Sequence, residues 1–166
     1  GYGASIKYDG ADQLDAPLGN CTNSPVESLE IEQKYFRVTR YDLRCDSGGA
    51  GRHRGGLGAY REYEILEDNV NMTVYSDRFK YPAKGVAGGQ DGTKAYIKLY
   101  HADGTQENLP SKGSRVLNKG DRMLVAIGGG AGYGNPKDRP KEEIESDIRR
   151  KKVSLEKARE LYGYQG

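Results

Sequence analysis

The residues best placed to do chemistry are Arg52, His53 and Arg54, which stand together inside a run of six glycines at residues 48–58. Backbone N–H groups of such a loop, with three side chains that can carry positive charge, would form a nest for an anion or a contact for a partner surface. Two flanking arginines would lower the pKa of His53 and keep its imidazole neutral near pH 7, as a proton acceptor requires. The alternatives are a solvated loop histidine and a connection whose glycines serve backbone geometry alone.

Other catalytic and cofactor motifs do not fit this sequence. The glycine run at residues 128–134 lacks the Lys-Ser or Lys-Thr of a P-loop and the long helix that follows a dinucleotide-binding loop, so tight backbone packing is the favoured interpretation. Cys21, Cys45, His53 and His101 lack the paired spacing of a zinc site, and we expect no metal site and no cofactor site in this chain. No GxSxG nucleophile motif occurs either.

The composition describes a polar chain that relies on neighbours. Its 166 residues are 35% apolar, with no Trp, two Phe and thirteen Tyr, and we expect it to pack against a partner or the remainder of a longer polypeptide. A net charge of +2 gives no field that would gather nucleic acid or an anionic membrane, so neither partner is predicted. Two cysteines without an export signal favour reduced thiols in a cytoplasmic protein, and one Cys21–Cys45 disulfide stays open.

The elements that must position the glycine loop are mostly strands. Residues 1–19 form an extended lead-in, residues 20–136 a β-rich module, and residues 137–166 a helical hairpin. A short helix is predicted at residues 25–32, after a capping-box pattern. Period-two alternation predicts about seven short strands, in a sandwich or barrel-like arrangement. The predicted strands lie at residues 34–43, 57–66, 70–77, 94–100, 105–109, 115–117 and 122–127.

Two hairpins and the end of the chain follow from local signals. The strands at 57–66 and 70–77 are interpreted as one hairpin, and those at 94–100 and 105–109 as a second. Pro140 begins a helix in which Ile144 and Ile148 stack at i and i+4. Ser154 caps a second helix that Gly163 ends.

Several long motifs in a fixed order resemble the C-terminal part of the hydantoinase B family. That family includes the B half of 5-oxoprolinase and related subunits of acetone and acetophenone carboxylases. The motifs are Gly19 to Glu30 (GNCTNSPVESLE), Phe36-Arg37-Val38, Tyr41-Asp42-Leu43-Arg44, the loop at 46–58, Ser76-Asp77-Arg78, Gly85-Val86-Ala87-Gly88-Gly89, the run at 128–134, and Val153-Ser154 through Ala158 to Tyr162-Gly163.

The resemblance implies ATP-dependent chemistry on a ketone or a cyclic amide. In such systems an A-type subunit is expected to bind ATP and phosphorylate the substrate's carbonyl oxygen, and the B-type subunit to hydrolyse or carboxylate the activated species. ATP and a divalent metal are expected in partner subunits or in an N-terminal region of longer family members. This chain would then be a C-terminal module or small subunit, inactive alone, in a cytoplasmic hetero-oligomer with the large A-type subunit and the rest of the B-type subunit.

Within that frame, Asn20 and Asn23 are the first candidates to line a shared site. Short amides before a helix N-terminus can hold a carbonyl or phosphate oxygen, although Asn23 is equally able to organise only the turn. Arg52, His53 and Arg54 come next, as anion or interface contacts. The alternative function is a non-catalytic assembly subunit that contacts partners through its tyrosine-bearing strand faces and its helical tail.

Overall fold

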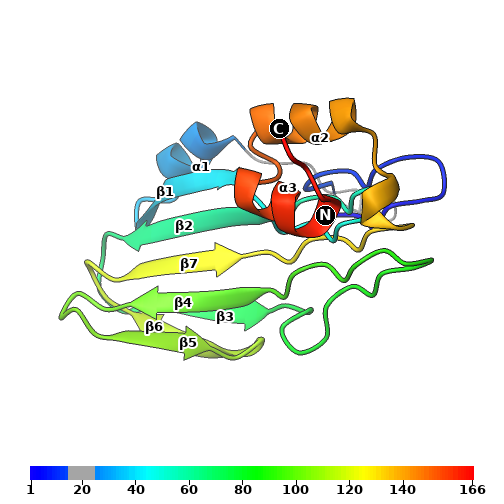
Figure 1. The fold of residues 1–166 in the computed structure, drawn as a ribbon. Helices are drawn as coiled ribbons and strands as arrows, with labels where there is room; N and C mark the ends of the chain where they lie inside the picture. Colours follow the sequence, from blue (N-terminus) through cyan, green and yellow to red (C-terminus); the bar gives the residue numbers. More distant parts are fainter. Residues whose placement is uncertain (15–24) are drawn as a thin grey trace.

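The computed structural model describes residues 1–14 and 25–166, which form two antiparallel sheets with helices toward the β1 side of the larger sheet (Figure 1). The larger sheet has the order β1 (Phe36–Leu43), β2 (Ala59–Ile65), β7 (Arg122–Ala126), β4 (Tyr96–Tyr100) and β5 (Gln106–Leu109). The smaller sheet pairs β3 (Val70–Tyr75) with β6 (Lys112–Leu117). The helices are α1 (Val26–Glu32), the 3-10 turn η1 (Pro136–Asp138), α2 (Lys141–Arg149) and α3 (Leu155–Tyr162).

The main core lies between the two sheets. Alternation along β4 turns Ile97 and Leu99 toward the smaller sheet, where they meet Val74 of β3 and Leu117 of β6. The opposite face of the larger sheet carries tyrosines and charged residues at the intervening positions, such as Tyr60 and Tyr96. The expectation of a mainly β sandwich is therefore confirmed, and the described strands form no closed barrel.

The predicted hairpin of β4 and β5 is confirmed, but the predicted hairpin of β2 and β3 is wrong. β2 pairs with β1 and β7, whereas β3 pairs with β6 in the other sheet. The short link that ends at Asn69, whose φ is 60°, carries the chain from one layer to the other. Both strands alternate as expected, yet alternation fixes which face is buried and not which strand is the neighbour.

The predicted boundaries of the three α-helices are confirmed. The Ser154 side chain accepts a hydrogen bond from the Lys157 amide at 3.1 Å, and Gly163 ends α3 with a φ of 73°. Ile144, Ala158 and Tyr162 pack together in a second core. α1 lies where it was predicted, although Ser24 of its capping-box pattern is outside the described residues. No helix in the described ranges has the length and apolar character needed to cross a bilayer.

The three glycine-rich runs, at residues 48–58, 85–92 and 128–134, pack against one another through their backbones. The Gly49 amide donates to the Gly130 carbonyl at 2.8 Å, and the Gly132 amide donates to the Gln90 carbonyl at 2.9 Å. A Cβ atom on Gly132 would overlap the carbonyl group of Ala50. The interpretation of residues 128–134 as tight backbone packing is confirmed.

We expect Gly132→Ala to lower the free energy of unfolding by about 1–3 kcal/mol, because the added methyl group meets backbone atoms that cannot rotate away. Gly3→Ala is the matched control, since the nearest atom to its new Cβ is the Ala131 carbonyl oxygen at 3.9 Å. Urea unfolding of both variants measures the difference. Equal stabilities would contradict backbone-to-backbone packing of the glycine runs.

Candidate functional site

Two buried arginines lie at the centre of the glycine-rich end of the molecule. The Arg54 side chain is 2% exposed; its Nη1 lies 3.3 Å from Asp12 Oδ1 and its Nε lies 3.4 Å from Asp147 Oδ2. Arg139 Nη2 lies 2.7 Å from Asp9 Oδ2 and 2.8 Å from Asp147 Oδ2. We call Asp9, Asp12, Arg54, Arg139 and Asp147 the buried arginine cluster. It joins the N-terminal segment, the glycine loop, the residue after η1 and helix α2.

Two carboxylates of the buried arginine cluster, those of Asp9 and Asp12, are held in their ionised form. Burial raises the pKa of Asp9, but hydrogen bonds and charge from Arg139, with the Arg54 amide, outweigh burial and lower it overall. The pKa of Asp12 is lowered in the same way, against burial, by the Leu57 amide and by Lys152, whose Nζ lies 2.6 Å from Asp12 Oδ2. Asp9 and Asp147 raise the pKa of Arg139 in spite of its burial.

The predicted residues Arg52, His53 and Arg54 face carboxylates of the same chain. Arg52 Nη1 lies 3.2 Å from Glu143 Oε2, and the His53 side chain is 15% exposed with Nδ1 3.9 Å from Asp9 Oδ1. An anion at Arg54 would have to displace one of its aspartates. Contact of these three side chains with an anion or a partner stays a prediction.

The predicted anion nest has few free backbone amides, and the predicted roles of Asn20, Asn23 and Cys21 cannot be compared with the described residues. Several amides of the proposed nest are used internally: Gly55 donates to the Gly49 carbonyl at 2.9 Å and Gly56 to the Tyr2 carbonyl at 2.8 Å. Asn20 and Asn23 lie outside the described residues, so their role also stays a prediction. The same holds for pairing of Cys21 with the exposed Cys45.

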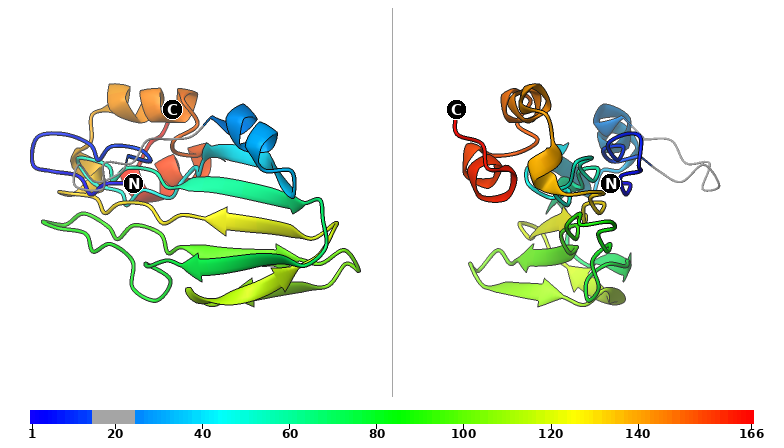
Figure 2. Two further views of the ribbon diagram at one scale, coloured as in Figure 1. Left: turned by 180° about the vertical axis from the view of Figure 1, so that it is seen from behind. Right: turned by 45° about the vertical axis from the view of Figure 1, so that its right-hand side comes forward.

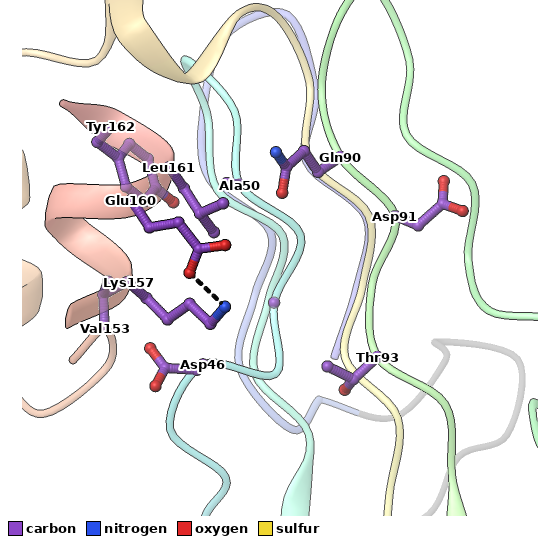
Figure 3. A pocket seen from close by; sticks show the side chains of 11 residues that line it. Asp46, Ala50, Gln90, Asp91, Thr93, Val153, Lys157, Glu160, Leu161 and Tyr162 are labelled. Carbon is purple, nitrogen blue, oxygen red and sulfur yellow. Dashed lines mark hydrogen bonds and ion pairs between the residues drawn. The ribbon is translucent and has the colours of Figure 1, made fainter.

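A pocket of about 400 Å³ opens beside the glycine loop and was missed by the sequence analysis (Figure 3). Helix α3 supplies one wall, and Figure 3 shows the Gln90 amide on the wall opposite the Lys157–Glu160 ion pair, whose Nζ–Oε2 distance is 2.6 Å. Its lining comes from three separate segments, which no local spacing connects. The lining residues are Asp46, Gly48, Ala50, Gln90, Asp91, Thr93, Val153, Lys157, Glu160, Leu161 and Tyr162.

Tyr162 connects this pocket with the buried arginine cluster. Burial, with a smaller contribution from Asp147, raises its pKa to about 12, although Arg139 opposes the shift. The phenol is consequently neutral at physiological pH. In residues 1–14 and 25–166 no group of three or more His, Cys, Asp or Glu side chains is arranged to hold a metal ion. The described residues thus provide an internally bonded glycine-rich end with a pocket of mixed polar and apolar lining beside it.

Comparison with protein families gives a match to the Hydantoinase B/oxoprolinase profile over residues 1–136. The chain belongs to this family. Among the relatives of this hydantoinase B/oxoprolinase chain, one named as the B-type component of a D-/L-hydantoinase, from a Pseudomonas species, is 35% identical over 98% of this chain and 27% of its own length. The beta component of the Pseudomonas jessenii caprolactamase is 31% identical, over 98% of this chain and 29% of its own. The chain thus spans less than a third of the length of these relatives.

Solved structures show the same fold within larger chains. The ATP-dependent caprolactamase of Pseudomonas jessenii matches 99% of this chain with a TM-score of 0.81 and 29% identity, and this chain covers 30% of that chain. A nucleotide-free acetone carboxylase matches 97% of this chain with a TM-score of 0.80 at 18% identity, over 26% of its own chain. The resemblance found in the sequence motifs is confirmed. The matches extend past residue 136, where the buried arginine cluster links Arg139 and Asp147 to the hydantoinase B/oxoprolinase region.

Acid is expected to loosen the buried arginine cluster. The folded-state pKa values of Asp9 and Asp12 are lowered, so their stabilisation is fully present above the unfolded value of about 3.9 and is lost as the pH falls through the folded values. Urea unfolding between pH 6 and pH 2.5 should show a smaller loss of stability on acidification for Asp9→Asn than for the wild type. Identical losses would mean that Asp9 does not contribute.

Asp147→Asn should lower the free energy of unfolding by about 3–5 kcal/mol, because it leaves Arg54 and Arg139 buried with too little negative charge. The control Asp42→Asn removes a carboxylate from an exposed pair with Arg40 and should cost about 1 kcal/mol or less. Equal effects in urea unfolding would show that the cluster is no more important than a surface ion pair.

Proposed function

We propose that this chain is a module of the B-type subunit of an ATP-dependent carboxylase or amidohydrolase complex that acts on a ketone or a cyclic amide, and that it is not catalytic alone. The observation that carries the proposal is the caprolactamase match, because an ATP-dependent enzyme contains this fold over 99% of the chain at 29% identity. A relative named 5-oxoprolinase, from Pestalotiopsis fici, is 33% identical over 82% of this chain and supports the cyclic-amide class.

The proposal assigns the cofactors and partners to other parts of the assembly. ATP binds to a large A-type subunit, and a divalent metal binds in partner subunits or in the region of the B-type polypeptide beyond this chain. The assembly is a cytoplasmic hetero-oligomer. The hydantoinase and caprolactamase relatives are each named as one component of an enzyme, which supports a multi-subunit assembly.

The module would supply one wall of a shared site. Asn20 and Asn23 would hold a carbonyl or phosphate oxygen of the activated substrate. Arg52 and His53 would border that wall, and Arg54 would hold it in place through the buried arginine cluster, which fixes the glycine loop against α2. The wall must be rigid because a misplaced oxygen acceptor or donor loses most of its effect on a transition state.

A second candidate is a non-catalytic assembly subunit, and the outer face of the larger sheet favours it. Arg40 lies 4.0 Å from the ring centroid of Tyr60, and Arg44 lies 5.1 Å from that of Tyr96. Tyrosine and arginine are among the residues enriched at the energetic centres of protein interfaces. This face would then dock a partner subunit without contact to substrate.

Reconstitution tests these alternatives. The complete B-type polypeptide, mixed with an A-type subunit, is expected to hydrolyse ATP when supplied with a hydantoin, 5-oxoproline, caprolactam or acetone. Residues 1–166 alone are expected to hydrolyse no ATP with any of these substrates. Asn23→Ala should lower kcat/KM by about tenfold or more, because one hydrogen bond to developing charge is lost, while assembly stays intact.

Asn108→Ala, on the edge strand β5, is the matched control and should leave turnover unchanged. If Asn23→Ala also leaves turnover unchanged while Tyr60→Ala dissolves the complex, the assembly function is supported instead. No ATP hydrolysis with any of the four substrates would contradict the proposed substrate classes.

A further inference from the structure

The two sheets of the sandwich are unequal, and the difference leaves part of the larger sheet uncovered. The larger sheet has five strands, and the smaller sheet that packs on it has only two. In the left view of Figure 2, β3 and β6 stand before the β4 and β5 side of the larger sheet, and β2 extends past them. β6 follows β5 after a short connection, so β3 is the strand of the smaller sheet that borders the uncovered side.

An apolar cavity of about 170 Å³ opens at this border. It lies between the inner face of β1 and β2 and the strand β3. Tyr35, Phe36 and Tyr63 form an edge-to-face row along it, with neighbouring ring centroids 5.4 Å apart, and Tyr35 is 43% exposed. The lining residues are Tyr35, Phe36, Tyr63, Ile65, Val70, Asn71, Met72, Leu117 and Met123. Aromatic rings left in water beside a core are a cost unless another surface covers them.

The backbone of β3 offers a free hydrogen-bonding edge above this cavity. The Ser76 amide donates to the Ser111 carbonyl at 2.8 Å, so in this register the even-numbered residues of β3 bond to β6. The N–H and C=O groups of Asn71, Thr73 and Tyr75 therefore point away from β6. Within the described part of the chain, no other strand pairs with β3.

A second copy of this chain does not fit that edge. If two β3 strands paired antiparallel, the larger sheets of the two copies would lie on the same face of the joined smaller sheets. Each larger sheet extends past its own β3 toward the other copy. With strands about 4.8 Å apart, these overhanging strands would occupy the same space. In a parallel pair the partner's outward residues Asn71, Thr73 and Tyr75 would face the cavity, and two of these are polar. The edge accepts a single extended segment without a sheet of its own behind it.

We propose that an extended segment of the B-type polypeptide, outside residues 1–166, adds as a third strand beside β3 and fills the cavity with apolar side chains at alternate positions. This inference rests on the proposed function, in which the chain is part of a longer subunit. The relatives support that source, because this chain spans only 27–30% of them and most of their polypeptide lies elsewhere. Main-chain hydrogen bonds to β3 give the affinity, and the cavity selects the side chains.

Photo-cross-linking in the complete B-type polypeptide tests the source of the strand. A benzoylphenylalanine in place of Tyr75, which is 81% exposed, should cross-link to a segment of the same polypeptide outside residues 1–166 whose apolar residues alternate. The control position is Val116 on β6, one strand further from the new edge, where that cross-link should be weaker by about tenfold. Cross-links from position 75 to a second copy or to the A-type subunit, or no cross-link, would overturn the inference.

A backbone substitution tests the pairing itself. Thr73→Pro removes an N–H that β6 does not use, and proline is tolerated on edge strands. It should reduce the position-75 cross-link by about tenfold, because the lost hydrogen bond belongs to the added strand. Thr73→Ala keeps the backbone N–H and removes the γ-methyl group and the hydroxyl, which lies 3.1 Å from Ser114 Oγ, so it should keep the cross-link. Circular dichroism confirms that both variants are folded.

Equal cross-linking in the two folded variants would contradict strand addition. Cross-linking needs no turnover, so its outcome is independent of ATP hydrolysis. If the cross-link forms in a polypeptide that catalyses nothing, the proposed reaction fails and the strand addition stands. If turnover is present and the cross-link is absent, the strand addition fails alone.

Discussion

Two buried arginines, compensated by aspartates from distant parts of the chain, organise the glycine-rich end of this molecule. Arg54 lies in the glycine loop, Asp9 precedes it by 45 residues, and Asp147 follows it by 93. Removal of any one partner leaves an uncompensated charge in a site with little water. This lowers the free energy of unfolding far more than the loss of a surface ion pair does. The N-terminal segment, the loop and helix α2 must therefore come together as one unit, and the backbone packing of the three glycine runs completes it.

In the proposed function the chain holds no catalytic group of its own. This organisation explains how such a polar chain can still contribute to the reaction. The sandwich buries its apolar residues between two sheets and leaves tyrosine and arginine on the outer face. The glycine-rich end bonds its amides internally and pairs its arginines, and in the proposed function it serves as a rigid wall. In the proposed assembly, ATP and the reacting groups come from neighbours, and the wall keeps the shared site in shape.

Local features of this fold were predictable from the sequence, whereas long-range partners were not. Ser154 and Gly163 mark the ends of α3 because capping depends on a few adjacent residues. The separation of β2 and β3 into different sheets was not predictable, since a strand's alternation contains no information about its neighbour. Arg54 was recognised as a charged residue in a shaped loop, but its burial depends on carboxylates that no spacing connects to it.

The most direct measurement is a structure of the complete complex with a bound nucleotide. The proposed function predicts that the phosphates and any metal are held outside residues 1–166, and that Arg54 and Arg139 keep their bonds to Asp9, Asp12 and Asp147. A nucleotide held by residues 1–166 alone, with its phosphates on Arg54 or Arg139 in place of the aspartates, would contradict it.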